Sequence, residues 1–120
     1  MPTQERLADF IATVERNDHV EAIERFYAPH ASMQENNTAP RVGRDVLVSH
    51  EKAALARLAK MDTEPAGLVV HDGDNVVIRW VFHMTNPKGE TLRFEELTHQ
   101  VWDGDLIVRE RFFYDSRQFG

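Results

Sequence analysis

The chain has 120 residues, 42% of them hydrophobic and 28% charged, and its net charge is −6 at pH 7 because 20 acidic residues outweigh 14 basic ones. This length is typical of one domain with its own core, and the acidic balance argues against nucleic acid and anionic membranes as partners. The absence of cysteine excludes disulfide scaffolds, thiolate metal sites and cysteine nucleophiles. Neither a signal-like N-terminus nor an apolar run of the roughly 18–20 residues of a membrane span is present, so we expect a cytoplasmic protein.

The first third of the chain predicts two helices. An apolar stripe with i, i+3, i+4, i+7 spacing indicates a helix over residues 4–16, with Thr3 as its cap. Asp18 and Glu21 have capping-box spacing for a second, shorter helix, which Pro29 ends.

A short strand over residues 31–35 and a loop over residues 36–40 precede the third predicted helix. This helix follows Gly43 and spans residues 45–61, because one of its sides is apolar as far as Met61 and the other is charged.

Strands separated by strong turn sequences make up the rest of the chain. They are predicted over residues 66–71, 76–85, 91–102 and 106–114. Helices followed by a run of strands indicate an α+β fold with an antiparallel meander, and a twisted sheet of this length can curl around the helices and leave a pocket.

Four segments, in this order and spacing, resemble the nuclear-transport-factor-2-like superfamily, most closely its SnoaL-like group, which includes polyketide cyclases. They are Tyr-Ala-Pro-His-Ala-Ser-Met at 27–33, Val-Gly-Arg-Asp at 42–45, the strand–turn–strand at 70–76 and the final hairpin at 101–115. The resemblance implies one domain over residues 1–120: a cone-shaped, curved antiparallel sheet around three N-terminal helices with an internal pocket. Members of this superfamily have diverse functions, so the fold alone does not set an activity.

Catalytic members of this group place carboxylates in an apolar pocket, where the low polarity raises the pKa of a carboxyl group toward neutrality. Glu35 matches the position of the catalytic aspartate of delta-5-3-ketosteroid isomerase, and is then a general base; the alternative is an exposed loop glutamate. The oxyanion partners of that isomerase fall at Phe10 and near Thr98, which argues against steroid isomerisation but not against another proton transfer.

Strand 76–85 has one wholly apolar face and one mixed face that carries Arg79 and His83. The apolar face could cover either the core or a dimer interface. The resemblance implies that Arg79 and His83 lie on the pocket side, where His83 could titrate and Arg79 could pair with a carboxylate or contact substrate.

The resemblance also implies that alternate residues of the last two strands face the pocket. Glu96 and Glu110 are then catalytic candidates, and Thr98, Phe112 and Tyr114 are candidates for substrate contact. The alternative is a structural ion-pair network or a solvated face.

Metal and nucleophile sites find no support in the motifs. The histidines have no H-x-H or H-E-x-x-H spacing, no serine lies in a G-x-S-x-G elbow, and there is no glycine-rich phosphate loop. We therefore predict no metal and no cofactor.

The sequence thus predicts a homodimer, formed through the sheet face, whose pocket holds a small hydrophobic molecule. The expected chemistry is acid–base catalysis of isomerase, cyclase or dehydratase type. The alternative is a ligand-binding or dimeric interaction module on the same fold that is not catalytic.

Overall fold

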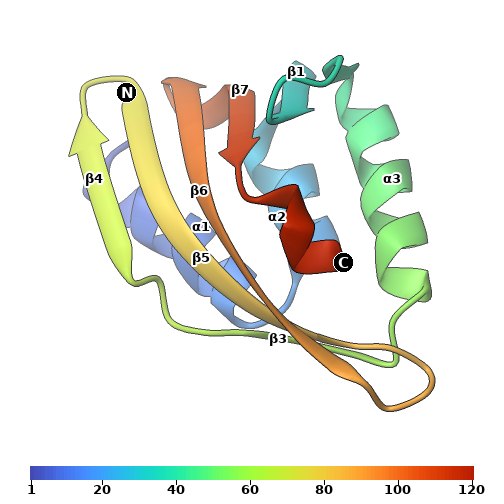
Figure 1. The fold of residues 1–120 in the computed structure, drawn as a ribbon. Helices are drawn as coiled ribbons and strands as arrows, with labels where there is room; N and C mark the ends of the chain where they lie inside the picture. Colours follow the sequence, from blue (N-terminus) through green and yellow to red (C-terminus); the bar gives the residue numbers. More distant parts are fainter.

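The computed structural model describes residues 1–120 as three helices, seven strands and a terminal 3₁₀ helix (Figure 1). The helices are α1 (Gln4–Glu15), α2 (His19–Phe26), α3 (Arg44–Ala56) and the 3₁₀ helix η1 (Ser116–Phe119). The strands are β1 (Tyr27–Glu35), β2 (Arg41–Val42), β3 (Lys60–Thr63), β4 (Leu68–Asp72), β5 (Asn75–Thr85), β6 (Thr91–Asp103) and β7 (Leu106–Phe113). No helix combines the length and the apolar character needed to cross a bilayer.

All strands belong to one sheet in the order β2-β1-β7-β6-β5-β3, with β4 also paired to β5. The hairpins β5–β6 and β6–β7 are antiparallel as predicted, but β1 pairs with β7 in parallel, so the sheet is mixed. The register between β1 and β7 shifts between Tyr27 and Ser32. Pro29 lies in this irregular stretch, where its lack of a backbone N–H breaks no regular hydrogen bond between the strands.

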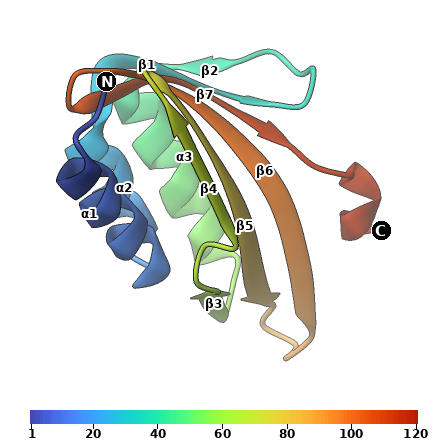
Figure 2. The same ribbon diagram turned by 90° about the vertical axis from the view of Figure 1, so that its left-hand side faces the viewer.

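The long strands β5 and β6 curve strongly, and all three helices lie on the concave side of the sheet (Figure 2). This arrangement is the expected α+β cone. Its narrow end is closed by a core in which Phe10 of α1 packs edge-on against Phe26 and Trp102, with ring centroids 5.4 and 5.9 Å apart. Phe26 and Trp102 are almost completely buried.

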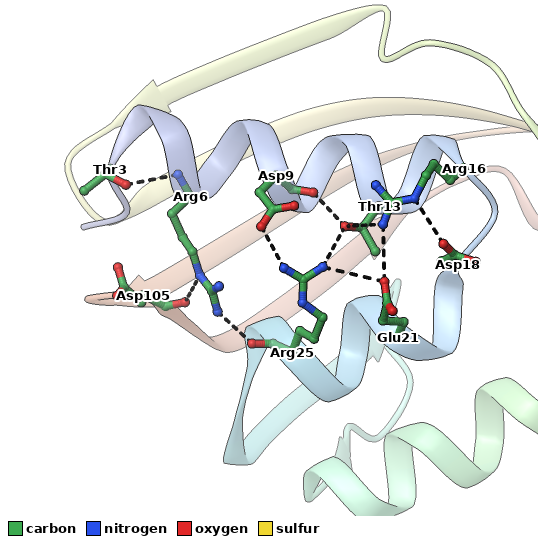
Figure 3. A network of polar contacts seen from close by, with 9 residues as sticks. All are labelled: Thr3, Arg6, Asp9, Thr13, Arg16, Asp18, Glu21, Arg25 and Asp105. Atoms are coloured by element: carbon green, nitrogen blue, oxygen red, sulfur yellow. Dashed lines mark hydrogen bonds and ion pairs between the residues drawn. The ribbon is translucent and has the colours of Figure 1, made fainter.

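A polar network on the outside of the cone ties α1 to α2 (Figure 3). Arg25 donates to the carboxylate of Asp9 at 2.7 Å, and Arg6 donates to the carbonyl oxygens of Arg25 and Asp105 at 2.7 and 3.0 Å. The guanidinium groups of Arg6 and Arg25 both lie over the ring of Phe26, 4.1 Å and 4.8 Å from its centroid, respectively. The network therefore fixes the two helices against the β6–β7 turn.

Three local predictions were wrong. Pro29 does not end the second helix, because α2 already ends at Phe26 and Pro29 lies inside β1. Asp18 stands at the N-cap of α2 but makes no side-chain cap bond, because its carboxylate accepts from Arg16 at 3.1 Å. The third helix ends at Ala56 instead of residue 61, because Met61 belongs to β3, where it pairs with Met84 of β5.

Candidate functional site

A cavity of about 500 Å³ lies between the concave face of the sheet and the helices. Seventeen of its 25 lining residues are hydrophobic. Ala54, Leu55 and Leu58 line it from the α3 side and stay only half-buried or less, because no side chain of the sheet fills the space opposite them. A cavity of this size and polarity suits a small organic molecule.

Aromatic rings form much of the cavity wall. Trp80, Phe82 and Phe94 are stacked across β5 and β6, with centroids 6.0 and 6.4 Å apart. Phe94 also contacts Tyr114 and Phe119, each at 4.9 Å, so the C-terminal η1 borders the cavity. A ligand in the cavity therefore meets flat apolar surfaces.

Glu110 of β7 is the most deeply buried acid that faces the cavity, and only 3% of it is exposed. Its Oε1 accepts from the hydroxyl of Tyr27, and its Oε2 accepts from the side-chain amide of Gln100 at 2.6 Å. Burial raises the pKa of Glu110 to about 7, although both hydrogen bonds lower the pKa because they favour the ionised form.

Glu96 of β6 is the second buried acid of the cavity, and it pairs across the sheet with Trp80. Burial is the main cause that raises the pKa of Glu96 well above its ordinary value, and the neighbouring charge of Glu110 adds to it. Neither Glu96 nor Glu110 takes part in an ion pair. Two buried carboxyl groups without an ion-pair partner therefore share one largely apolar cavity.

Two further acids line a more exposed part of the cavity. Glu35, at the end of β1, pairs with Arg41 at 2.6 Å, so one of its oxygens is already occupied. Glu51 of α3 is half-buried, and burial raises its pKa while the nearby charge of Arg41 lowers it. His50 lies beside them on α3, and its pKa is lowered first by burial and then by Arg41.

Most of the residues predicted for the site do lie around this cavity. Glu35, Glu96, Glu110, Phe112 and Tyr114 all line it. The register explains this, because cross-strand partners share a face: Glu110 lies opposite Gln100, and Phe112 lies opposite Glu35.

Three predicted residues do not line the cavity. The expected inward orientation of Arg79 and His83 is wrong, because β5 turns its apolar face toward the helices. His83 accordingly bonds to Glu64 at 2.6 Å, and Arg79 is exposed, so Arg79 pairs with neither Glu96 nor Glu110. Thr98 is fully buried on the inner face, but it lies outside the cavity lining and its Oγ1 has no hydrogen-bond partner.

Glu51 and Tyr27 are the site residues that sequence reasoning missed. Glu51 follows Leu47 by four residues and precedes Leu55 by four, so it is an acid within the apolar stripe of its helix, which is a readable signal. The strand predicted over residues 31–35 already begins at Tyr27, and this early start of β1 brings the Tyr27 hydroxyl to Glu110.

His19, from α2, also lines the cavity and packs edge-on against Phe82 at 5.7 Å. Burial lowers its pKa, so the imidazole is neutral at pH 7. No group of three or more His, Asp or Glu side chains is arranged to hold a metal ion.

Comparison with known proteins gives one family match. The family model for the SnoaL-like domain matches residues 7–110. No curated protein sequence matches the chain.

Solved structures share the fold at low sequence identity. A candidate SnoaL-like polyketide cyclase from Mesorhizobium loti is 21% identical, with a TM-score of 0.76 over 92% of this chain and 97% of that one. A nuclear-transport-factor-2-like protein of unknown function from Burkholderia pseudomallei is 11% identical, with a TM-score of 0.81 over 96% and 92%. The epoxide hydrolase/cyclase-like enzyme SalBIII, which has a role in pyran ring formation in the polyether salinomycin, is 18% identical, with a TM-score of 0.78 over 96% and 92%.

Proposed function

The chain belongs to the SnoaL-like domain family, and from this premise we propose that it is a cofactor-independent acid–base enzyme for a small, largely apolar molecule. The reaction is of isomerase, cyclase or dehydratase type. One observation carries the proposal: Glu96 and Glu110 are buried in the same cavity, and neither takes part in an ion pair.

The surroundings of the two acids assign them different roles. Two hydrogen bonds to Glu110 favour its ionised form, whereas the only group that lowers the pKa of Glu96 is the nearby hydroxyl of Thr98. Burial and the charge of Glu110 raise the pKa of Glu96 well above the ordinary range. Carboxyl groups whose surroundings separate their pKa values divide into an acid and a base. Glu110, whose pKa is about 7, is therefore the group that takes up a proton as general base and can return it, and Glu96 is the general acid of the proposed reaction.

Other cavity residues contact the ligand in this proposal. Phe112 and Tyr114 provide an apolar wall with one hydroxyl group, and Glu35, paired with Arg41, adds a polar group on the more exposed side. The names of similar proteins mention polyketide cyclases and pyran ring formation, which agrees with a neutral ring-forming substrate.

The test begins with a thermal-shift screen of small apolar carbonyl, epoxide and ring compounds, since a bound ligand raises the melting temperature. Any stabilising compound is then incubated with the protein and analysed by NMR for turnover. We expect conversion, and we expect Glu96→Gln and Glu110→Gln each to slow it at least about 100-fold while binding changes little.

The matched control is Glu95→Gln, which makes the same change one residue away on the opposite face of β6, where Glu95 is half-exposed and pairs with Arg93. Its rate should equal that of the wild type. A ligand that binds but is recovered unchanged would favour the alternative, a binding module that is not catalytic.

We further propose that the protein is a homodimer that pairs through the outer face of the sheet. One row of this face crosses four strands through Leu68, Arg79, Leu97 and Phe113, so the exposed Arg79 stands between two apolar positions. Leu68, Leu97 and Phe113 are 45%, 41% and 43% exposed, and Val70 of β4 adds a fourth exposed apolar side chain at 48%. A second copy of the same face would cover these apolar side chains.

Sedimentation at micromolar concentration tests the dimer. We expect the wild type to sediment as a dimer and Leu97→Arg as a monomer, because the new guanidinium group would lie beside Arg79 and be buried in the interface without a partner of opposite charge. Val46→Arg introduces the same charge at an exposed apolar residue of α3 and should remain dimeric. A wild-type monomer would rule the dimer out.

A further inference from the structure

A chain of hydrogen bonds fixes the orientation of the Glu110 carboxyl group. The indole of Trp102 donates to Oε1 of Gln100 at 3.0 Å, and an indole N–H can only donate. The amide oxygen of Gln100 must therefore face Trp102, and its NH₂ group must face Oε2 of Glu110 at 2.6 Å. Because a donor occupies Oε2, a proton on Glu110 favours Oε1.

Oε1 faces only one protein partner, the hydroxyl of Tyr27, and Tyr27 itself lines the cavity. When Glu110 is ionised, the hydroxyl of Tyr27 donates its proton to Oε1. When Oε1 carries a proton, that proton is donated to the Tyr27 oxygen, and the hydroxyl hydrogen must turn elsewhere. The cavity is the open side, so the protonation of Glu110 decides whether Tyr27 offers a donor to a ligand.

We propose that the Tyr27 hydroxyl is a catalytic group that passes a proton between Glu110 and an oxygen atom of the ligand. This inference rests on the proposed acid–base function of the cavity. In the donating direction, the Tyr27 O–H bond breaks as its proton moves to the ligand, and the proton of Glu110 moves to the Tyr27 oxygen. One proton leaves Glu110, one reaches the ligand, and Tyr27 ends neutral. The accepting direction is the reverse.

Tyr27 acts as a relay and not as an acid in its own right. Burial and the charges of Glu110, Glu51 and Glu96 raise the pKa of Tyr27 well above its ordinary value, so it does not ionise alone. The titratable groups that face this pair are all acidic: Glu96 from β6, Glu51 from α3 and Glu35 from β1. Arg44 contacts only the backbone carbonyl of Tyr27, at 3.2 Å.

The ligand class follows from this geometry. A ligand that Tyr27 serves must present a hydrogen-bond-accepting oxygen, such as a carbonyl, ether or epoxide oxygen, on an otherwise apolar frame. A hydrocarbon of the same shape would bind the aromatic walls but could not use the relay.

The test compares cyclohexanone with methylenecyclohexane, its hydrocarbon counterpart, by NMR titration at pH 5.5 and pH 8.5. For the wild type we expect the ketone to bind about five-fold more tightly at pH 5.5, which corresponds to one hydrogen bond, and the hydrocarbon to bind equally at both values. The wild-type series alone already tests the relay.

Two variants should each reproduce one state of the relay at both pH values: one in which Tyr27 can donate to the ligand, and one in which it cannot. In Glu110→Gln the new amide can accept from Gln100 and donate to Tyr27, as protonated Glu110 does, so the ketone should keep its pH 5.5 affinity at both pH values. In Tyr27→Phe the ketone should bind weakly at both, and binding of the hydrocarbon shows that the cavity is intact. As a control, Glu95→Gln changes a residue on the opposite face of β6, outside the cavity, and should keep the pH dependence of ketone binding.

The outcomes separate the relay from the proposed function. A ketone preference that still depends on pH in Tyr27→Phe would assign the donor to another group, such as Glu96, and overturn the relay. Equal ketone binding at both pH values in the wild type would also overturn the relay while leaving the cavity a ligand site. Failure of both probes to bind at either pH would overturn the proposed function, and the relay with it.

Discussion

Between pH 4.5 and pH 8 the free energy of unfolding should fall by about 3 kcal/mol through the Glu110 carboxyl group alone. Its pKa is about 7 in the folded protein, against an ordinary value of 4.5. Below pH 4.5 both the folded and the unfolded state carry the proton, so this group favours neither. As the pH rises through this window the unfolded chain loses the proton first, which favours unfolding, and the full destabilisation by Glu110 is reached above pH 7.

Glu110→Gln isolates this contribution, because an amide does not titrate. Urea unfolding at pH 4.5, 6 and 8 should give a free-energy difference between variant and wild type that shifts by about 3 kcal/mol in favour of the variant. For Glu95→Gln, on the outer face of β6, the difference in the free energy of unfolding from the wild type should stay the same at all three pH values. Parallel curves for Glu110→Gln would mean that the pKa of Glu110 is the same in the folded and in the unfolded protein.

Trp102→Ala should lower the free energy of unfolding by about 3–5 kcal/mol. Trp102 is 1% exposed, packs edge-on against Phe10 and is among the largest fully buried side chains. Its removal leaves a void at the narrow end of the cone and deprives Gln100 of the donor that fixes its amide. Urea unfolding at pH 6 measures the loss.

Trp102→Phe separates packing from hydrogen bonding in the same measurement. It keeps most of the ring volume but has no N–H group, so it should lose clearly less stability than Trp102→Ala. Because the Gln100 amide is then free to turn, the pKa of Glu110 should rise toward the value that burial alone would give. A loss below about 1 kcal/mol for Trp102→Ala would contradict the packing described for this end of the core.

Most of the helices and strands could be predicted from the sequence, because the patterns that indicate them are local. Strong turn sequences separate the strands from residue 68 onward, and the apolar stripe of residues 4–16 defines α1. The parallel pairing of β1 with β7 could not be derived this way, since it joins segments from opposite ends of the chain and no local pattern encodes it. The end of α3 was missed because Met61 continues the helical spacing although it belongs to β3.

The predicted orientation agrees with the structure where acids interrupt an inward-facing strand pattern, since Glu96 and Glu110 line the cavity. The face of β5 was misjudged because its inner face is uniformly apolar, and such a face fits a cavity wall as well as a core or an interface. Tyr27 and Gln100 carry no separate signal in the sequence. Their importance depends on side-chain contacts with Glu110 across three strands, which only the folded chain creates.

The central claim is that the two buried acids of the cavity keep their protons toward neutral pH. The most direct measurement is an NMR titration of the protein labelled with ¹³C at the glutamate carboxyl carbons, with Glu96→Gln and Glu110→Gln used to assign the signals. We predict a midpoint near pH 7 for Glu110 and one well above the ordinary value for Glu96. Midpoints near 4.5 for both groups would contradict the account.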